Sequence, residues 1–113
     1  MPILRSAIFI LLLFSSCKKT QVDNGTLCIE NMIQAFKLLP KGNPPRSITQ
    51  YLYKGQTVYY VPAQCCDQYS DLYDENCNFL GHPDGGFSGA GDGKLPNFFK
   101  DAKNPMLIWK DDR

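Results

Sequence analysis

The sequence is poor in the residue types from which catalytic centres are usually built. Its 113 residues include one histidine, His82, and no Cys-x-x-Cys motif. A second histidine for a metal site is therefore missing, and so is the paired thiol of a redox enzyme. A chain of this length also leaves little room for a deep substrate cleft. We expect a protein that is not an enzyme.

Positive charge is missing from a long stretch of the chain. No Lys or Arg lies between residues 55 and 93, whereas this window contains Asp67, Asp71, Asp74, Glu75, Asp84 and Asp92. Over the whole chain 12 basic residues balance 11 acidic ones, a formal net charge of +1. This balance gives no reason to expect a nucleic-acid partner. We expect the acidic window and the flanking basic residues to neutralise each other across the fold.

No apolar run is long enough to cross a bilayer, but the N-terminus has a short one. Arg5 precedes the apolar residues 7–14, and two serines stand directly before Cys17. A positive charge, a short apolar run and small residues at the cleavage point are typical of a secretory signal. The string FSSC at residues 14–17 resembles the lipobox of bacterial lipoproteins. That resemblance implies diacylglyceryl modification of Cys17, and an ordinary signal peptide with a chance cysteine is the alternative.

The lipobox divides the chain into three parts. We expect residues 1–16 to be the signal peptide, residues 17–26 to be the lipidated Cys17 with a polar tether, and residues 27–113 to form one small globular domain. The lipid bilayer is then a partner through acylated Cys17, and the protein lies in the bacterial cell envelope. An acidic run directly after the cysteine resembles the export signal of bacterial lipoproteins that reach the cell surface. Here Lys18 and Lys19 follow the cysteine instead. We therefore expect an outer-membrane position that faces the periplasm.

The remaining cysteines predict disulfides. Four are left once Cys17 is lipidated: Cys28, Cys65, Cys66 and Cys77. An even number in a short exported chain indicates two bridges. A bond between the adjacent cysteines would close a strained ring. We therefore expect one of the adjacent pair to bond Cys28 and the other to bond Cys77, without distinguishing which.

The spacing of apolar residues predicts an α+β fold, in which one N-terminal helix packs on a small, mainly antiparallel sheet braced by disulfides. Thr26 can cap a helix that begins at Leu27 and ends before Pro40. β-Branched and aromatic residues predict a hairpin around Lys54-Gly55, with neighbours such as Tyr59 and Tyr60 on opposite faces of the sheet. The strands expected on this basis are residues 47–53, 56–61, 71–73, 77–80 and 106–109.

Two short strings stand out beside these patterns. They are CCD at residues 65–67 and HPDGGF at residues 82–87. Together they resemble a family of small lipoproteins of Bacteroidetes-type bacteria with no assigned function. The resemblance implies no activity, substrate or catalytic residue. It therefore leaves the molecular role of the envelope protein to be argued from its residues.

Six of the nine glycines lie in residues 81–93. Glycine lets the backbone take a positive φ and lets a ligand approach closely, and a loop of this composition is costly to order. The tyrosines of the hairpins offer an exposed aromatic platform for a glycan or an envelope protein, although tyrosines that cover a sheet face are more often structural. We expect the loop of residues 81–93 to be the functional surface, at which a partner or an ion binds. Its candidate binding residues are His82, Asp84, Gly85, Gly86 and Asp92.

Calcium is the single cofactor that the loop suggests, and otherwise we expect none. Asp84 and Asp92 supply the hard oxygen ligands that calcium prefers, but no EF-hand spacing is present. A compact loop in which both carboxylates merely accept backbone N–H bonds is the simpler interpretation. We expect a non-catalytic binding or structural role. The alternatives are a calcium-binding module and a small enzyme-inhibitor-like domain displayed from the membrane.

Overall fold

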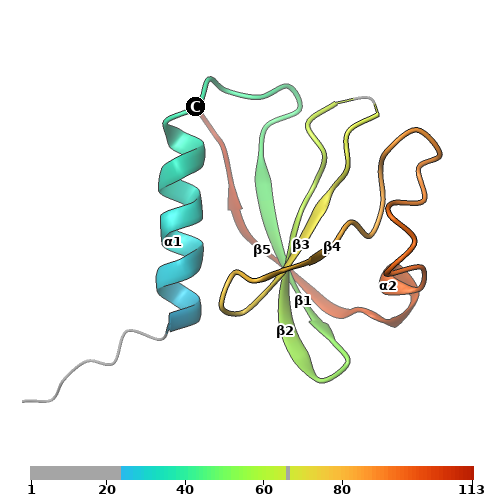
Figure 1. Cartoon of the computed structure of the whole chain (residues 1–113). Helices are drawn as coiled ribbons and strands as arrows, with labels where there is room; N and C mark the ends of the chain where they lie inside the picture. Colours follow the sequence, from blue (N-terminus) through green and yellow to red (C-terminus); the bar gives the residue numbers. More distant parts are fainter. Residues whose placement is uncertain (1–23, 66) are drawn as a thin grey trace, which may run out of the picture.

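A five-stranded antiparallel sheet forms the centre of the protein, in a computed structural model that describes residues 24–65 and 67–113 (Figure 1). The strand order is β4-β3-β2-β1-β5, so the last strand pairs with the first. The expected α+β class is therefore confirmed. The elements are α1 (Asn24–Lys37), β1 (Ser47–Tyr53), β2 (Gln56–Val61), β3 (Asp71–Asp74), β4 (Phe79–Gly81), α2 (Phe98–Asp101) and β5 (Lys103–Lys110).

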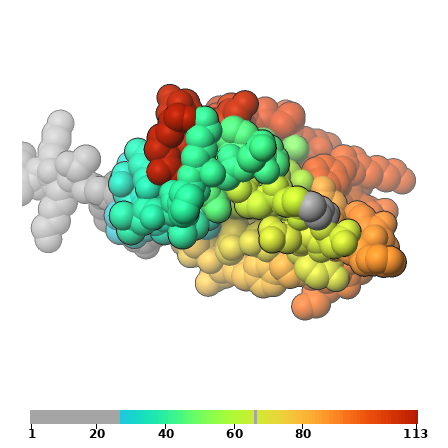
Figure 2. Space-filling model, turned by 90° about the horizontal axis from the view of Figure 1, so that it is seen from above, coloured from blue at the N-terminus to red at the C-terminus, as the bar shows by residue number. Residues whose placement is uncertain are grey.

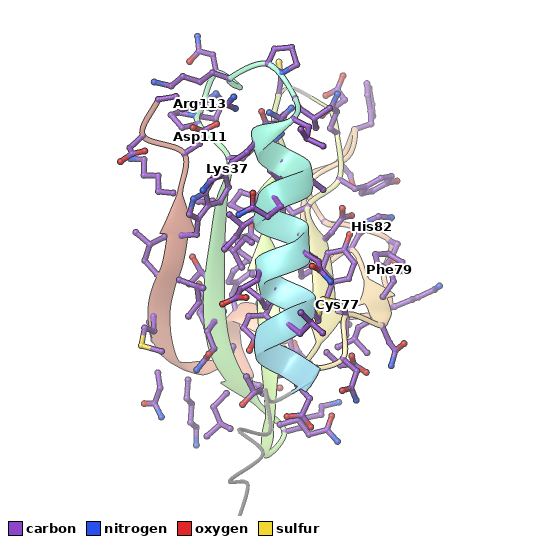
Figure 3. All side chains as sticks on the ribbon, turned by 90° about the vertical axis from the view of Figure 1, so that its left-hand side faces the viewer. Lys37, Cys77, Phe79, His82, Asp111 and Arg113 are labelled. Carbon is purple, nitrogen blue, oxygen red and sulfur yellow. A yellow bond between two sulfur atoms is a disulfide. The ribbon has the colours of Figure 1, made fainter. Side chains whose placement is uncertain are left out.

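Helix α1 covers one face of the sheet, as Figure 3 shows. It begins at Asn24 rather than at Leu27, so Thr26 lies within the helix and not at its cap. The helical spacing of its apolar residues brings one stripe of α1 onto Ile48 and Tyr59 of the sheet. That stripe consists of Cys28, Ile29, Met32, Ile33 and Phe36.

The opposite face of the sheet is covered by the segment that leads into β5. Phe98 of α2 is 1% exposed and packs with Val58 and Leu72. Tyr60 belongs to this face and Tyr59 to the face under α1, so the predicted alternation is confirmed. Helix α2 was not expected, because its four residues are too few to show a helical period.

The first hairpin matches the expectation residue by residue. Strands β1 and β2 pair around a two-residue turn in which Lys54 and Gly55 have φ values of 50° and 76°. Two successive positive φ values define the type I′ turn that suits the twist of an antiparallel pair. Strand β5 is longer than predicted and includes Pro105. Proline is tolerated in an edge strand or beside a break in register, and β5 is an edge strand whose register with β1 shifts between Gln50 and Leu52.

The expected disulfide pairing is wrong. Cys28 of α1 is bonded to Cys77, whose Cα atom lies 5.9 Å away in the β3–β4 connection. The expectation rested on the strain of a bond between Cys65 and Cys66, which would leave these two as the partners of Cys28 and Cys77. However, Cys65 precedes β3 and Cys77 follows it, so the two lie at opposite ends of that strand. Cys65 is disulfide-bonded as well. Cys17 and Cys66 lie outside the described residues.

The expected neutralisation of the acidic window by the flanking basic residues does not take the form of close ion pairs in residues 24–65 and 67–113. There the close contacts between a basic and an acidic side chain are His82 with Asp71 and Arg113 with Asp111, and neither involves a lysine. None of the helices in this part of the chain is long and apolar enough to cross a membrane.

Arg113 ties the C-terminal residues to the end of α1, beside which they lie in Figure 2. Its guanidinium donates to the carbonyls of Lys37 and Leu39 at 3.0 and 2.9 Å and contacts Asp111 at 2.7 Å. The Asp111 side chain is buried, and its hydrogen bonds to Arg113 lower its pKa to about 2. Helix-terminal carbonyls that have no partner within the helix are thereby satisfied.

We predict that the Cys28–Cys77 bridge is a main source of stability. It closes a sequence separation of 49 residues, and removing a native bridge from a small exported domain costs about 2–5 kcal/mol. The double variant Cys28→Ala/Cys77→Ala should therefore melt at a lower temperature than the wild type under non-reducing conditions. A non-reduced peptide map should contain a crosslinked peptide with both cysteines. A map that instead joins Cys77 to Cys65 or Cys66 would contradict the structure.

Candidate binding site

The glycine-rich loop of residues 81–93 is a built structure rather than an open connection. Within it, Gly85 N–H donates to Gly89 O at 3.2 Å, and Gly91 N–H donates to Gly85 O at 3.0 Å. It is also paired with the segment before β3, since Gly86 N–H donates to Gln68 O at 3.0 Å. A side chain on Gly85 would collide with the backbone at Gln68. The glycines therefore permit close backbone packing as well as positive φ.

The two aspartates of the loop hold it in place. Asp92 accepts hydrogen bonds from the backbone N–H groups of Lys94 and His82, both at 3.0 Å, and these donors lower its pKa. Asp84 Oδ2 accepts a 2.8 Å bond from the Tyr60 hydroxyl, and Asp84 Oδ1 is buried with no hydrogen-bond partner among the described residues. Burial raises the pKa of Tyr60 to about 12, and Asp84 adds to that shift. Both carboxylates therefore act as braces.

Calcium gains no support from this arrangement. In residues 24–65 and 67–113 no group of three or more His, Cys, Asp or Glu side chains is placed to hold a metal ion. Both oxygens of Asp92 already accept hydrogen bonds from backbone N–H groups. A calcium-binding loop therefore remains a hypothesis from sequence alone.

His82 is oriented by two acceptors. Its Nδ1 lies 2.9 Å from the carbonyl oxygen of Ser70 and 3.0 Å from Asp71 Oδ1. Because both neighbours accept hydrogen bonds, Nδ1 is the nitrogen that carries the proton. Asp71 Oδ2 in turn accepts a 3.3 Å bond from Tyr73, whose pKa is raised by burial and by Asp71. The imidazole ring is thus fixed at the start of the loop.

The imidazole packs against two aromatic rings, those of Phe79 and Tyr69, and Tyr69 is the one that lines a pocket. The imidazole and the Tyr69 ring stack, with centroids 4.5 Å apart and an interplanar angle of 17°. Tyr69 nevertheless stays 48% exposed. A Cβ atom on Gly86 would collide with the Tyr69 ring, so the loop backbone contacts the ring directly. His82 and Gly86 together hold an exposed aromatic ring in one orientation.

Tyr69 borders a shallow pocket of about 170 Å³. Arg46 enters it from the start of β1, where Nη1 donates to Pro40 O at 2.8 Å and the guanidinium lies 6.0 Å from the centre of the Phe36 ring. The pocket therefore combines aromatic rings with a cation, a carboxylate and two amide side chains. Its lining residues are Phe36, Arg46, Val61, Pro62, Ala63, Gln64, Gln68, Tyr69, Asp71 and Tyr73.

The predicted loop residues thus lie beside this pocket but do not line it. His82 and Gly86 act through Tyr69, while Asp84, Gly85 and Asp92 hold the loop. Sequence reasoning missed Arg46, which is separated from Asp71 by two strands. The tyrosines of the hairpins were the available signal, since they suggested an exposed aromatic platform. Cys17 lies outside the described residues, so its lipidation stays a prediction.

Phe87 forms the tip of the loop. It is 95% exposed, in a turn closed by a 3.2 Å hydrogen bond from Gly89 N–H to Gly86 O. An aromatic ring in this position contributes nothing to the core of the domain.

We predict different effects for two glycines of this loop. Gly86 and Gly89 have similar φ values of 76° and 78°, but only a Cβ on Gly86 meets a neighbour, the ring of Tyr69. Gly89→Ala should therefore cost about 1 kcal/mol from backbone strain alone. Gly86→Ala should cost about 1–3 kcal/mol more, and it should shift the NMR signals of the Tyr69 ring. Equal unfolding free energies and an unmoved ring would contradict this packing.

Comparison with known proteins gives a family without a described activity. A model of a domain of unknown function, DUF6970, matches residues 34–111, which include the whole sheet and the whole candidate site. Neither a curated protein nor a solved structure matches the chain. The match extends over more than half of the sequence, and the chain therefore belongs to the DUF6970 family.

Proposed function

We propose that this protein is a lipid-anchored envelope protein that binds a sugar unit of an envelope glycan in the pocket beside Tyr69, without catalysis. The observation that carries the proposal is the half-exposed Tyr69 ring, held by His82 at the rim of a pocket that contains Arg46 and Asp71. The C–H faces of sugar rings pack on aromatic rings, and their hydroxyls bond to carboxylate, amide and guanidinium groups. All of these groups line this one pocket.

The size of the pocket favours one sugar ring. Its volume of about 170 Å³ lies below the roughly 300–1,000 Å³ of sites that enclose a drug-sized ligand. A terminal or branching sugar therefore fits better than a buried oligosaccharide. The rest of the glycan would remain in solvent.

The carboxylates support binding rather than hydrolysis. Glycoside hydrolysis commonly uses two carboxylates on either side of the scissile bond. Among the residues that line the pocket Asp71 is the one acid, and its oxygens already contact His82 and Tyr73. The described cysteines Cys28, Cys65 and Cys77 are oxidised and offer no thiolate nucleophile.

A lipid anchor agrees with the position of the pocket. Phe36 lies in the last turn of α1, so the pocket is at the end of the helix farthest from Cys17 along the chain. Anchoring through Cys17 would turn the start of α1 toward the bilayer and the pocket away from it. For the location of the protein we keep the outer membrane, facing the periplasm, on the grounds of the lipobox and of Lys18-Lys19.

A protein partner is the second candidate, and Phe87 is the observation that favours it. Exposed aromatic side chains on rigid turns are frequent anchors in protein interfaces. Tyr69 lines the pocket and Phe87 does not, so variants at these positions distinguish the two candidates.

We predict that Cys17→Ser abolishes membrane anchoring. Two or three acyl chains anchor a protein stably, whereas the peptide alone has no described element that could do so. The wild type should enter the detergent phase in a phase-partitioning assay, with a mass that matches cleavage before Cys17 plus lipid. The variant should lose the lipid mass and leave the detergent phase. Identical masses and partitioning would contradict the anchor.

We further predict that Tyr69→Ala weakens sugar binding about tenfold or more, because it removes the stacking surface. The measurement is binding of the full chain to immobilised hexoses, N-acetylhexosamines and uronic acids. Phe87→Ala is the control, since it also removes an exposed aromatic ring but one that does not line the pocket, and it should bind as the wild type does. If no sugar of the panel binds, or if Tyr69→Ala binds normally, the glycan proposal fails.

A further inference from the structure

A second pocket gathers three lysines. It has a volume of about 340 Å³ and is lined by Leu52, Lys54, Gly55, Lys100, Asp101 and Lys103. Within the described part of the chain, none of the three lysines forms an ion pair. Lys54 lies over the ring of Tyr53 at 5.2 Å, where its charge stays available to a ligand. Three cations against the single acid Asp101 make this pocket suited to an anion.

The backbone at Lys54 gives an independent reason to assign the lysine a function. Its φ of 50° places it in the left-handed region, at the first central position of the type I′ turn. Asparagine, aspartate and glycine adopt this conformation at less cost than lysine does. A residue that strains the turn in which it lies is best explained by what its side chain does.

The pocket lies at the end of the domain that leads to Cys17. Figure 1 and Figure 3 share a vertical axis, and in both the β1–β2 turn lies at the same end of the molecule as the start of α1. Cys17 precedes Asn24 by seven residues, a separation of at most about 24 Å even in an extended chain. A lipid on Cys17 would therefore hold this end of the domain next to the bilayer surface.

We propose that Lys54, Lys100 and Lys103 bind the phosphate of an anionic lipid headgroup. The inference rests on the proposed anchor at Cys17, because that anchor brings the pocket to the membrane. Lysine binds phosphate as a point charge without demanding one geometry, which suits a mobile headgroup. The contact would fix the orientation of the domain on the membrane and leave the Tyr69 pocket at its far end. A free phosphate ion has the same chemistry, but nothing would bring it to this end of the domain.

The test is chemical modification of lysines in the full lipidated protein. The protein is reconstituted in phosphatidylcholine vesicles with or without phosphatidylglycerol, neither of which has a reactive amine, and a membrane-impermeant amine reagent is applied. Lys54, Lys100 and Lys103 should react several-fold more slowly in the anionic vesicles. Lys37, in the last turn of α1, is the internal control and should react at the same rate in both. High salt should remove the protection, because it screens exposed charges.

Lys54→Asn is the decisive variant. Asparagine suits the type I′ turn better, so the variant should melt at the same temperature as the wild type or higher. It should nevertheless lose much of the protection at Lys100 and Lys103 in anionic vesicles. The matched control Lys37→Asn should keep that protection. A variant that melts lower, or that protects Lys100 and Lys103 as well as the wild type, overturns the assignment.

Two further measurements show which part of the proposal fails if the expected protection is not seen. In detergent, inorganic phosphate that protects the three lysines as strongly as anionic vesicles do would show a free-anion site and overturn the headgroup assignment. Flotation of the vesicles reports on the anchor independently. Protein that floats with both vesicle types but shows equal lysine reactivity overturns the lysine pocket and leaves the anchor intact. Protein that does not float overturns the anchor, and the headgroup assignment with it.

Discussion

The fold depends on one constraint. Its five-stranded sheet has two apolar faces, and among the helices of residues 24–65 and 67–113 only α1 is long enough to cover one of them. Helix α1 covers the face of Ile48 and Tyr59. Val58 and Leu72 lie on the other face, and the segment between β4 and β5 must cover them to keep them from water. Phe98 does this at the end of that segment. The glycine-rich loop is therefore held at both ends by the packing of the sheet.

Because its ends are held, the loop can be ordered at little extra entropic cost. Asp92 and Asp84 then fix its interior, and Gly86 brings the backbone against the ring of Tyr69. These contacts explain why residues that do not line the pocket still matter to the site. The exposed ring of Tyr69 is held from beneath by the loop, by His82 and by Asp71 behind it. A binding surface can be rigid in this way although half of it faces solvent.

The sequence was sufficient where structure follows from neighbours along the chain. Alternation of side chains and the Lys54-Gly55 pair predicted the β1–β2 hairpin to its ends. It was insufficient where partners come from distant segments. Cys28 and Cys77 are paired because β3 separates Cys77 from Cys65, and this requires the sheet order. The order of the strands in the sheet also brings Arg46 and Asp71 to one pocket. The glycines identified the loop, but they could not show that it packs against Tyr69.

The glycines of the loop also define where the protein can accept foreign sequence. A side chain at Gly85 or Gly91 would strike backbone, whereas Gly89 has no neighbour within 4 Å of a built Cβ. Next to it, Phe87, Ser88 and Ala90 are exposed and contribute nothing to the core. The turn at residues 87–90 is thus a natural point for inserting an epitope or a small tag. Such an insertion would report on the orientation of the domain in living cells without touching its sheet.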